Sequence, residues 1–406
     1  MKNVLKRVGI LILSILLLSA CNSSKDVSKT SEATKNKNAQ GVTDDEIVLG
    51  AWAPLSGAAA QWGTLVKGAQ SYFNKVNAEG GINGRKIRYV AYDDEYQPSR
   101  SVAAAKKLVE EDKVFAIVGA LGTSHHKAAL PYLTKKGIPV VAFASGDSSF
   151  VNPPIKTYFG LQTNYDIESR IFSQYAAKEL KAKTVGILFQ NDDFGKSYLA
   201  GAQKELKKLG IDIAAEVAYN LNDVDFSTPA MQMKKANPDV ILVFGAVKPV
   251  AGFWKELDKI GGKKPAIFNY GSGSDMTIFE LAGNDVMEGV MSSTWMTSVS
   301  EKDNPKIQAY LKQFTKDYPD EDPSANGPMS GWTFAQVMVE GLKRCGDDLS
   351  WENFIKQMET LKDWNGSLAY NVTYSPKNRY GQTSITMIQA KNGKLVKISD
   401  VIKYEP

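Results

Sequence analysis

From residue 46 onward, short apolar segments alternate with longer segments of helical periodicity, and this alternation constrains the fold more than any other feature of the chain. The predicted strands are residues 47–51, 87–92, 114–119 and 140–144, and the predicted helices between them are residues 64–78, 99–111 and 124–136. Strands that alternate with helices of this length form parallel sheets covered on both faces. The sequence therefore predicts the α/β class with a doubly wound sheet.

The same alternation starts again near residue 167. Further strands are predicted at residues 185–190, 213–219, 240–245 and 267–270, with helices at 167–180, 195–209, 227–235 and 249–260. One segment of each half has the same order, in which a helix with a basic C-terminal end is followed by an apolar strand that ends in Gly-Ala. These segments are AAAKKLVEEDKVFAIVGAL in the first half and AMQMKKANPDVILVFGAV in the second. Two similar α/β units in one chain are the simplest account.

The last third of the chain departs from this pattern. Helices are predicted at residues 305–316, 328–344 and 350–361, followed by a hairpin-like tail at 368–374 and 384–398 around the turn Lys391-Asn392-Gly393. A helical block after two complete units suggests that the chain returns to the first lobe, and several crossings would form a hinge. The expected bounds are residues 44–165 plus 297–365 for the first lobe and 166–296 plus 366–406 for the second.

The N-terminus predicts export. A basic start, an apolar run at residues 8–18 and two small residues before Cys21 resemble a bacterial lipoprotein signal, with residues 1–20 cleaved and the Cys21 thiol carrying a diacylglycerol. The apolar run is too short for a comfortable membrane span. An ordinary signal peptide with a chance cysteine is the alternative. We expect a chain anchored by its lipid to the outer face of the cell membrane, since two or more acyl chains make attachment stable.

Residues 22–43 are polar, rich in lysine and without apolar periodicity, so that the lipidated Cys21 and this segment are predicted to form a flexible tether. A docking role for its lysines is the alternative. Removal of the signal leaves 386 of the 406 residues, enough for two ordinary domains, and lowers the net charge from +5 to +2. This near-neutral balance, without a dense basic block, argues against a nucleic-acid-binding protein.

Cysteine and histidine usage argues against a metal site or a disulfide. Cys345 is the only other cysteine, and we expect it to pack as a small apolar residue at a helix end. His125 and His126 are adjacent, so on a helix they point about 100° apart and cannot share a ligand, although one of them could face a cleft. The chain lacks CxxC, HExxH, GxSxG, P-loop and GxGxxG motifs. We expect a binding protein rather than an enzyme, without a cofactor.

Two acidic pairs follow predicted strands. Asp93-Asp94 and Asp192-Asp193 are predicted to cap the helices that come next rather than to act as catalytic acids.

Several segments in order resemble the type I periplasmic binding proteins of the leucine/isoleucine/valine group. They are IVLGAWAPLSGAAAQWGTLVKGAQSYFNKVNAEGGINGRKI, AYDDEYQPSRSVAAAKKLV, FAIVGALGTSHHKAALPYLTKKGIPVVAFAS and ILFQNDDFGKSYLAG, and the similarity covers residues 46–400. The resemblance implies two Rossmann-like lobes joined by a multi-strand hinge, a cleft that closes on a small ligand, and delivery to the permease subunits of an ABC importer. It also implies a monomer, and the lipid tether indicates a Gram-positive source.

The strand ends predict an anion site at this cleft. In open parallel sheets, ligands bind beyond the carboxyl ends of the strands. The strand that ends at Gly119 leads into Thr123-Ser124, two good N-caps, and the next strand ends in Ala144-Ser145-Gly146. Hydroxyls and free amides at a helix start bind anions. We therefore expect Thr123, Ser145 and the Gly146 amide to hold a ligand carboxylate beside Ala144, with plain helix capping as the alternative, and the resemblance assigns the same role to Thr123.

The resemblance adds three apolar site residues. Trp62, in AAAQWG, would cover the ligand from the first lobe, and Phe194, in NDDFG, would close from the second. Met329, after Gly327-Pro328, matches another position that faces the cleft. Core packing is the alternative role for all three.

Departures from the family pattern bear on the ligand. Amino-acid binders of the family read the ligand ammonium with a tyrosine and an acid, where this chain has Val247 or Lys248 and Ser272. A buried ammonium without a carboxylate is costly, so a carboxylate that lacks an ammonium, such as an organic or aromatic acid, is favoured. Tyr270 is then expected to donate to the ligand and Lys248 to pair with a second acid group, with a solvated rim position as the alternative for both.

Two other functions remain open at this stage. Asp147 and Asp275 are nearby acids that would restore an aliphatic amino acid such as leucine, isoleucine or valine as the ligand. A ligand-sensing ectodomain for a separate signalling partner is the third possibility.

Overall fold

The computed structural model describes residues 38–403. The predicted signal peptide, the lipid-anchor residue Cys21 and residues 22–37 of the predicted tether lie outside the described residues. Residues 38–43 are already part of the fold, because Ala39 N donates to Leu349 O (3.0 Å) and the Gln40 amide donates to two backbone carbonyls. The prediction of a tether up to residue 43 is therefore wrong at its C-terminal end.

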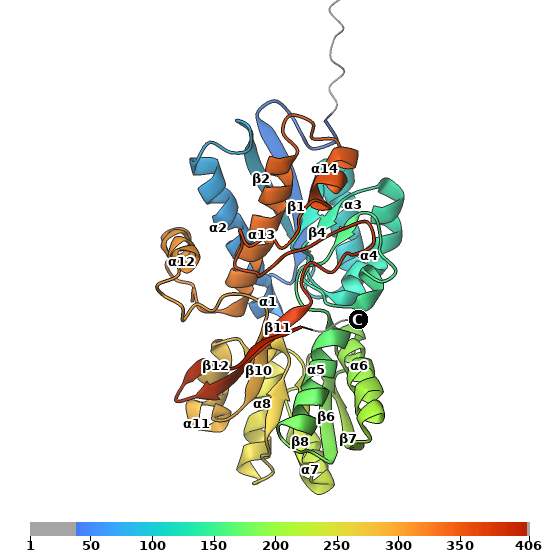
Figure 1. The fold of residues 1–406 in the computed structure, drawn as a ribbon, viewed down its shortest axis with the longest axis vertical. Coiled ribbons are helices and arrows are strands. Elements are labelled where there is room, and N and C mark those ends of the chain that lie inside the picture. Colours follow the sequence, from blue (N-terminus) through green and yellow to red (C-terminus); the bar gives the residue numbers. More distant parts are fainter. Residues whose placement is uncertain (1–37, 404–406) are drawn as a thin grey trace, which may run out of the picture. The chain divides into compact units, whose positions relative to one another are not determined.

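The first sheet is parallel and has the strand order β2-β1-β3-β4-β5 (Figure 1). Its strands are β1 (Glu46–Ala53), β2 (Lys86–Asp93), β3 (Ala116–Val118), β4 (Val140–Val141) and β5 (Tyr158–Phe159). Its helices are α1 (Ala60–Gly63), α2 (Leu65–Ala78), α3 (Pro98–Glu110) and α4 (Thr123–Lys136). β1, β3 and β4 are almost fully buried, as expected for a parallel sheet covered on both faces. We refer to this sheet and its helices as lobe 1.

The second sheet has the order β12-β11-β10-β9-β8-β6-β7 and is parallel except for β11, which runs antiparallel to both β10 and β12. Its strands are β6 (Thr184–Gln190), β7 (Asp212–Tyr219), β8 (Val240–Phe244), β9 (Ala266–Phe268), β10 (Met291–Thr294), β11 (Ser384–Lys391) and β12 (Lys394–Lys403). Its helices are α5 (Tyr165–Lys178), α6 (Asp193–Leu209), α7 (Ser227–Ala236), α8 (Val247–Lys259), α9 (Tyr270–Gly273), α10 (Thr277–Ala282) and α11 (Asn284–Met287). This is lobe 2, and the prediction of two α/β lobes is confirmed.

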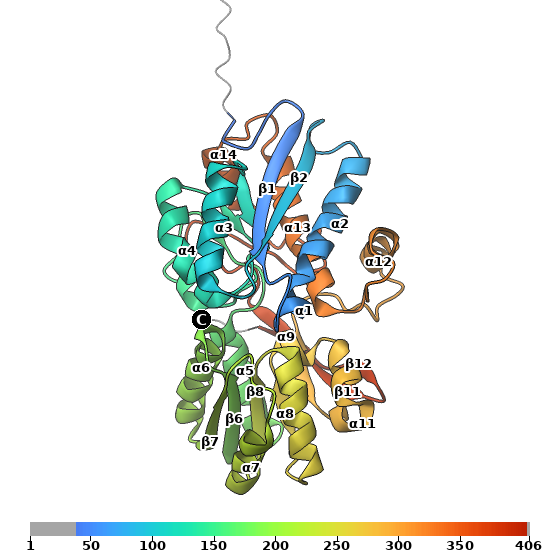
Figure 2. The same cartoon turned by 180° about the vertical axis from the view of Figure 1, so that it is seen from behind.

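The last helices return to lobe 1. They are α12 (Pro305–Asp317), α13 (Asn326–Arg344) and α14 (Trp351–Met358). α13 lies beside α2 in both views of the ribbon (Figures 1 and 2). Trp351 of α14 donates its indole N–H to the carbonyl of Phe115 at 2.8 Å, next to β3. The predicted return of the chain after lobe 2 is confirmed, while the residue bounds predicted for the lobes stay predictions.

Three segments cross between the lobes and are hydrogen-bonded to one another. Gly160 N donates to Arg379 O (3.0 Å), Gly381 N donates to Gly160 O (2.9 Å), and Thr297 N donates to Leu368 O (2.9 Å). The segments that follow β5, follow β10 and precede β11 therefore form one connection, which matches the predicted multi-strand hinge.

One predicted strand is absent. Residues 368–374 form only isolated bridges, of Ala369 with Met296 and of Val372 with Trp364, because they pair with the segments after β10 and after α14 instead of joining a sheet. The hairpin itself is confirmed, since β11 and β12 turn at Asn392-Gly393, both of which have positive φ angles (52° and 69°). The short strands β5 and β10 were not predicted.

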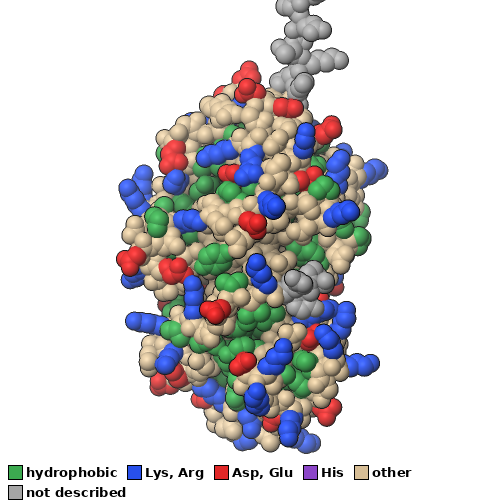
Figure 3. Space-filling model, viewed as in Figure 1, with side chains coloured by type: hydrophobic (Ala, Val, Ile, Leu, Met, Phe, Trp, Pro, Cys, Tyr) green, Lys and Arg blue, Asp and Glu red, His purple; other side chains and the backbone are tan. Residues whose placement is uncertain are grey.

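Surface charge is mixed. On the face seen in Figure 3, lysine and arginine side chains are spread over both lobes among acidic ones and do not form a single stripe.

Cys345 is buried at the C-terminal end of α13, as predicted. In the part of the chain that the structure describes, no helix has the length and apolar character needed to span a bilayer.

Helices α2 and α13 touch along their backbones. A Cβ atom added to Gly68 would lie 1.9 Å from the carbonyl oxygen of Pro328, and one added to Gly331 would lie 1.8 Å from that of Leu65. Neither backbone can retreat without moving a whole helix. These glycines therefore permit the close contact between the backbones of α2 and α13.

We expect Gly331→Ala to lower the free energy of unfolding by about 2 kcal/mol, because overpacking a close backbone contact outweighs the better helix propensity of alanine. Urea unfolding measures the difference. Gly252→Ala in α8 is the matched control, since its Cβ would meet only the ring of Phe226 at 3.0 Å. A change of about 1 kcal/mol or less is expected there. Equal effects of the two substitutions would contradict the packing argument.

Candidate functional site

A cavity of about 90 Å³ lies where the carboxyl ends of strands from both lobes meet. That volume corresponds to roughly six to nine water positions, since one buried water needs about 10–15 Å³ by this measure. Much of the wall is aromatic, from Trp62, Tyr96, Tyr165, Phe194, Tyr198, Tyr270, Trp295 and Phe334. The cavity is therefore suited to a small organic molecule with an apolar body.

A cluster of hydroxyls forms one end of the cavity. Thr123 is 1% exposed, and its Oγ1 lies 2.8 Å from Ser145 Oγ. Gly122 is the N-cap of α4, with φ at 108°, and no side chain caps this helix. The prediction that Thr123 and Ser124 cap the helix is therefore wrong. Thr123 is instead the first residue of the helix, and its hydroxyl is hydrogen-bonded to that of Ser145.

Tyr165 completes this cluster from lobe 2. Its phenol accepts a hydrogen bond from the Gln162 amide at 3.2 Å. Burial raises the pKa of Tyr165 to about 12, and hydrogen bonds from the Gly146 backbone, Ser145 and Thr123 oppose this shift. The Tyr165 phenol thus lies near the three groups predicted to hold a carboxylate, and its ring packs against Gly146.

Aromatic side chains from the two lobes meet over the cavity. Trp62 of α1 packs edge-on against Phe194 of α6, with ring centroids 5.6 Å apart. Trp62 also contacts Tyr96, and Phe194 contacts Tyr165. The contact of Trp62 with Phe194 therefore joins the two lobes over the cavity.

Polar contacts also join the lobes. The Tyr96 hydroxyl donates to Asp192 Oδ2 at 3.2 Å, and Lys127 Nζ lies 3.6 Å from Asp193 Oδ1. On the other side, the Tyr270 hydroxyl lies 3.1 Å from Ser330 Oγ and is also hydrogen-bonded to Asn326. These contacts exist only when the lobes are together.

Two buried carboxyl groups line lobe 2's side of the cavity. Glu168 is 1% exposed and accepts hydrogen bonds from Tyr270 N (2.8 Å), Ser293 Oγ (2.7 Å) and the Tyr198 hydroxyl. Asp275 accepts from the amide and hydroxyl of Thr277. Burial raises the pKa of both groups. The donors around them belong to the protein itself, so each carboxyl is satisfied without a ligand.

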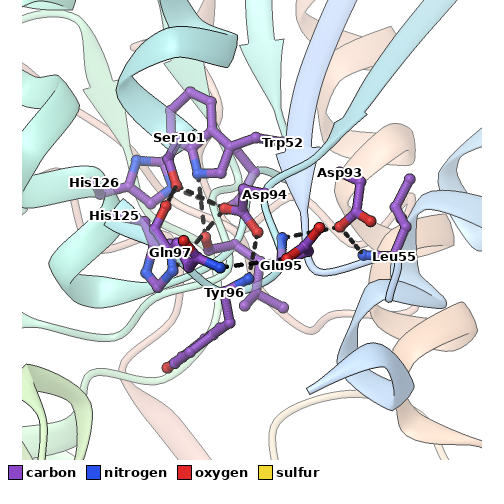
Figure 4. A network of polar contacts seen from close by, with 12 residues as sticks. Trp52, Leu55, Asp93, Asp94, Glu95, Tyr96, Gln97, Ser101, His125 and His126 are labelled. Carbon is purple, nitrogen blue, oxygen red and sulfur yellow. Dashed lines mark hydrogen bonds and ion pairs between the residues drawn. The ribbon is translucent and has the colours of Figure 1, made fainter. Parts of the chain in front are cut away.

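The loop after β2 positions Tyr96 (Figure 4). Glu95 and Tyr96 both have left-handed φ angles, 49° and 58°, which is costly for residues other than glycine. Asp93 accepts the Glu95 amide at 2.9 Å and Asp94 accepts the Tyr96 amide at 3.0 Å, which stabilises this conformation. The Tyr96 ring points away from Asp94 in the close-up view.

The predicted capping role is confirmed for one acidic pair and wrong for the other. Asp192 caps α6 by accepting Gly195 N at 3.1 Å. Asp93 and Asp94 do not cap α3, whose N-cap is Gln97, because their oxygens are taken up by the turn at residues 95–96, by the Leu55 amide and by the hydroxyls of Ser56 and Ser101.

Both histidines are buried under this loop. His125 Nε2 lies 4.0 Å from Asp94 Oδ2, and its ring packs on Tyr96 at 4.4 Å between centroids. His126 lies 2.8 Å from the carbonyl of Ala120 through Nε2 and packs on Trp52. Burial lowers the pKa of His125 to about 4 and of His126 to about 3, and raises that of Asp94 to about 6. Neither histidine lines the cavity, and among residues 38–403 no cluster of three or more potential ligands could hold a metal ion.

The structure brings part of the predicted site together. Five of the predicted residues line the cavity: Trp62, Thr123, Ala144, Phe194 and Tyr270. Ser145 and Gly146 lie directly behind Thr123 and line a small neighbouring space. Direct ligand contact by any of these residues stays a prediction.

Three other predicted residues do not line this cavity. Lys248 is exposed on α8, and Ser272 is buried in α9 with its hydroxyl hydrogen-bonded to Asn269 (2.9 Å). Met329 lines a second cavity next to the first. Of the two acids considered for an ammonium, Asp275 lines the cavity, whereas Asp147 is paired with Lys127 at 3.2 Å outside it.

Sequence reasoning missed Tyr96, Tyr165, Glu168, Trp295 and Asn326 as lining residues. A signal existed for two of them. Asn164 caps α5 by accepting the amides of Asp166 and Ile167, so NYDIE marks a helix start at a crossing point of the chain. Tyr165 and Glu168 lie in the first turn of that helix. No comparable local pattern marks Trp295.

Comparison with known proteins gives a consistent result. A family model described as "Periplasmic binding protein" matches residues 46–394. The leucine-, isoleucine-, valine-, threonine- and alanine-binding protein of Pseudomonas aeruginosa is 24% identical over 304 residues, covering 75% of this chain and 79% of its own length.

Solved structures share the fold. A fatty acid ABC transporter substrate-binding protein from Thermomonospora curvata superimposes with a TM-score of 0.80 at 22% identity, over 91% of this chain and 95% of that one. The substrate-binding protein LivJ of Streptococcus pneumoniae, solved in complex with isoleucine, gives a TM-score of 0.75 at 21% identity, over 89% and 100% of the two chains.

We expect the two buried histidines to make the fold less stable as the pH falls. Their pKa values in the fold lie below 6.5, so between about pH 6.5 and pH 4 the unfolded chain binds protons that the folded chain does not, and stability falls as the pH falls. Asp94 has the opposite effect, because its raised pKa makes the fold retain a proton. We expect His126→Gln, which keeps an amide donor for Ala120, to reduce proton uptake on unfolding at pH 5 by about one. The pH dependence of the free energy of unfolding measures this, and an unchanged slope would contradict it.

Proposed function

Because this chain belongs to the periplasmic binding protein family, of the Leu/Ile/Val-binding type, we propose that it captures a small carboxylate ligand between its two lobes and delivers it to an ABC importer. The proposal names an organic acid without an ammonium group, with an apolar or aromatic body, as the ligand class. The family is one of extracytoplasmic binding proteins and not of enzymes.

The hydroxyl cluster at the start of α4 is the observation that carries this proposal. Thr123 and Ser145 lie 2.8 Å apart at the carboxyl ends of β3 and β4, beside the free amides of the first turn of a 14-residue helix. Donors at a helix N-terminus stabilise an anion. A ligand carboxylate bound beside these groups would carry the negative charge that this arrangement favours.

The aromatic wall supports an apolar ligand body. Trp62 and Phe194 approach from opposite lobes and would enclose a ring or a short branched chain. These aromatic side chains offer no negative charge to a ligand ammonium. The nearest acids, Glu168 and Asp275, already accept hydrogen bonds from donors of lobe 2.

An aliphatic amino acid is the second candidate ligand, and the same two acids favour it. Glu168 and Asp275 are buried carboxyl groups in the cavity wall, and a ligand ammonium would relieve the cost of their burial. Similar proteins represent both possibilities, since one is named for leucine and related amino acids and another for a fatty acid.

Ligand capture would stabilise the closed arrangement. A ligand shifts a conformational equilibrium only through contacts that differ between the two states. Contacts of Trp62 with Phe194 and of Tyr96 with Asp192 join the lobes around the cavity. A ligand that touches both walls adds to these contacts in the closed state alone.

We also propose that the protein is a monomer, anchored through a lipid on Cys21 to the outer face of a Gram-positive cell membrane. The order of a basic start, an apolar run, two small residues and a cysteine supports the anchor. Mass spectrometry of the membrane fraction would detect the diacylglycerol on Cys21, and a soluble product cleaved elsewhere would contradict it.

We expect Thr123→Ala to weaken binding of a carboxylate ligand about tenfold or more, because a hydrogen bond to a charged group is lost. Calorimetry with the best ligand of a screen measures the change. Thr123→Ser keeps the hydroxyl and is the matched control, with an effect of less than about threefold. Equal affinity of wild type and Thr123→Ala would remove Thr123 from the site.

Matched ligand pairs distinguish the two candidate ligand classes. We expect 3-phenylpropanoate to raise the melting temperature more than phenylalanine, and 4-methylpentanoate more than leucine, since each pair differs only in the ammonium group. Preference for the two amino acids would support the second candidate. In that case, Glu168→Gln should abolish the preference, whereas for acids without an ammonium it should have little effect.

A further inference from the structure

A second cavity of about 650 Å³ adjoins the first. It lies between the crossing segment after β10, the start of α13 and the hairpin of β11 and β12. Its size falls within the range of about 300–1,000 Å³ that is usual for small-molecule sites. None of the residues of the hydroxyl cluster lines it, so it is a separate compartment.

The inner part of this cavity is apolar. Met296, Met329 and Ile388 are buried there, at 3%, 5% and 5% exposure. Leu395 and Val396 of β12 are half-buried on the opposite side. Methionine side chains adapt readily to a flexible occupant. These surfaces match a hydrocarbon chain rather than a polar molecule.

The outer part of the cavity carries a net positive charge. Lys302, Lys394 and Lys397 line it and are exposed, together with one acid, Glu301. Lys397 is paired with Glu301 at 2.9 Å. Among the described residues, no ion pair is formed by Lys302 or Lys394, the two other lysines that line the cavity.

The wall between the two cavities is made by both lobes. Tyr270 of α9 and Asn326 of α13 line both spaces. The Asn326 amide donates to the carbonyl of Tyr270 (3.2 Å) and to Ser274 Oγ (3.0 Å), and the two side chains are hydrogen-bonded to each other. These hydrogen-bonded residues therefore separate the second cavity from the first.

We propose that this second cavity binds a single-chain aliphatic monocarboxylate, separately from the ligand held at Thr123. The hydrocarbon chain lies against Met296, Met329 and Leu395, and the carboxylate faces Lys302 and Lys394. Burial of the chain supplies the affinity, since each methylene removed from water adds to the binding free energy. The exposed lysines select an anionic head group and contribute less.

Decanoate is the probe for this site, and isothermal titration calorimetry with the whole folded chain measures its binding. We expect saturable binding that Lys302→Glu/Lys394→Glu weakens at least tenfold. Leu395→Asp, which places a charge on the apolar wall, should weaken it as well. Lys106→Glu, an exposed lysine on α3, is the control and should leave it unchanged. Decanol, which has the chain without the charge, should bind more weakly than decanoate.

Thr123→Ala separates this proposal from the proposed function. We expect it to impair binding of the small carboxylate of the screen and to leave decanoate binding intact. Decanoate binding that is lost in Thr123→Ala and retained in the double lysine variant would place the fatty acid in the first cavity and overturn the proposal. Absence of saturable decanoate binding to the wild type would overturn it too. Neither result depends on whether the small acid binds.

Discussion

A buried guanidinium holds the connection on which the two-lobe arrangement depends. Arg379 is 1% exposed, and its Nη2 donates to Glu359 (2.6 Å) and to the carbonyl of Lys156 (3.1 Å), while its Nε donates to that of Ile155 (3.3 Å). Its own carbonyl accepts the Gly160 amide. One side chain thus ties the last crossing segment to the chain before β5 and after α14. Removal of one partner from such a buried pair is strongly destabilising, so the register of the crossing is fixed here.

The sequence predicted the layers of the fold well, because the period of apolar residues follows directly from burial on two faces of a sheet. β1, β6 and β8 are continuous apolar runs, and the structure has strands at all three. The crossing was harder to predict. Residues 368–374 contain as many apolar residues as a strand, yet they form only isolated bridges with irregular segments, and no local pattern distinguishes these two kinds of burial. For the same reason β5 and β10 were not predicted, because they are short and are strands only by virtue of pairing with neighbouring strands.

The candidate site was predictable where it depends on strand ends. Thr123 and Ala144 line the cavity because parallel strands bring their carboxyl ends together, and this rule needs no side-chain detail. Tyr165 and Glu168 were missed because they come from a helix of the other lobe, and their position depends on how the lobes meet. Ser272 illustrates the reverse error, since its place in the chain suggested the cleft but its hydroxyl is used within its own turn.

The wall formed by Tyr270 and Asn326 has a consequence for the order of events in a binding cycle. Since each lobe contributes one half of this wall, separation of the lobes would break its hydrogen bonds and would join the two spaces. Filling and emptying of both spaces would then depend on the same movement. A molecule that spans the gap would wedge the halves apart, so its length alone would decide whether the protein can shut.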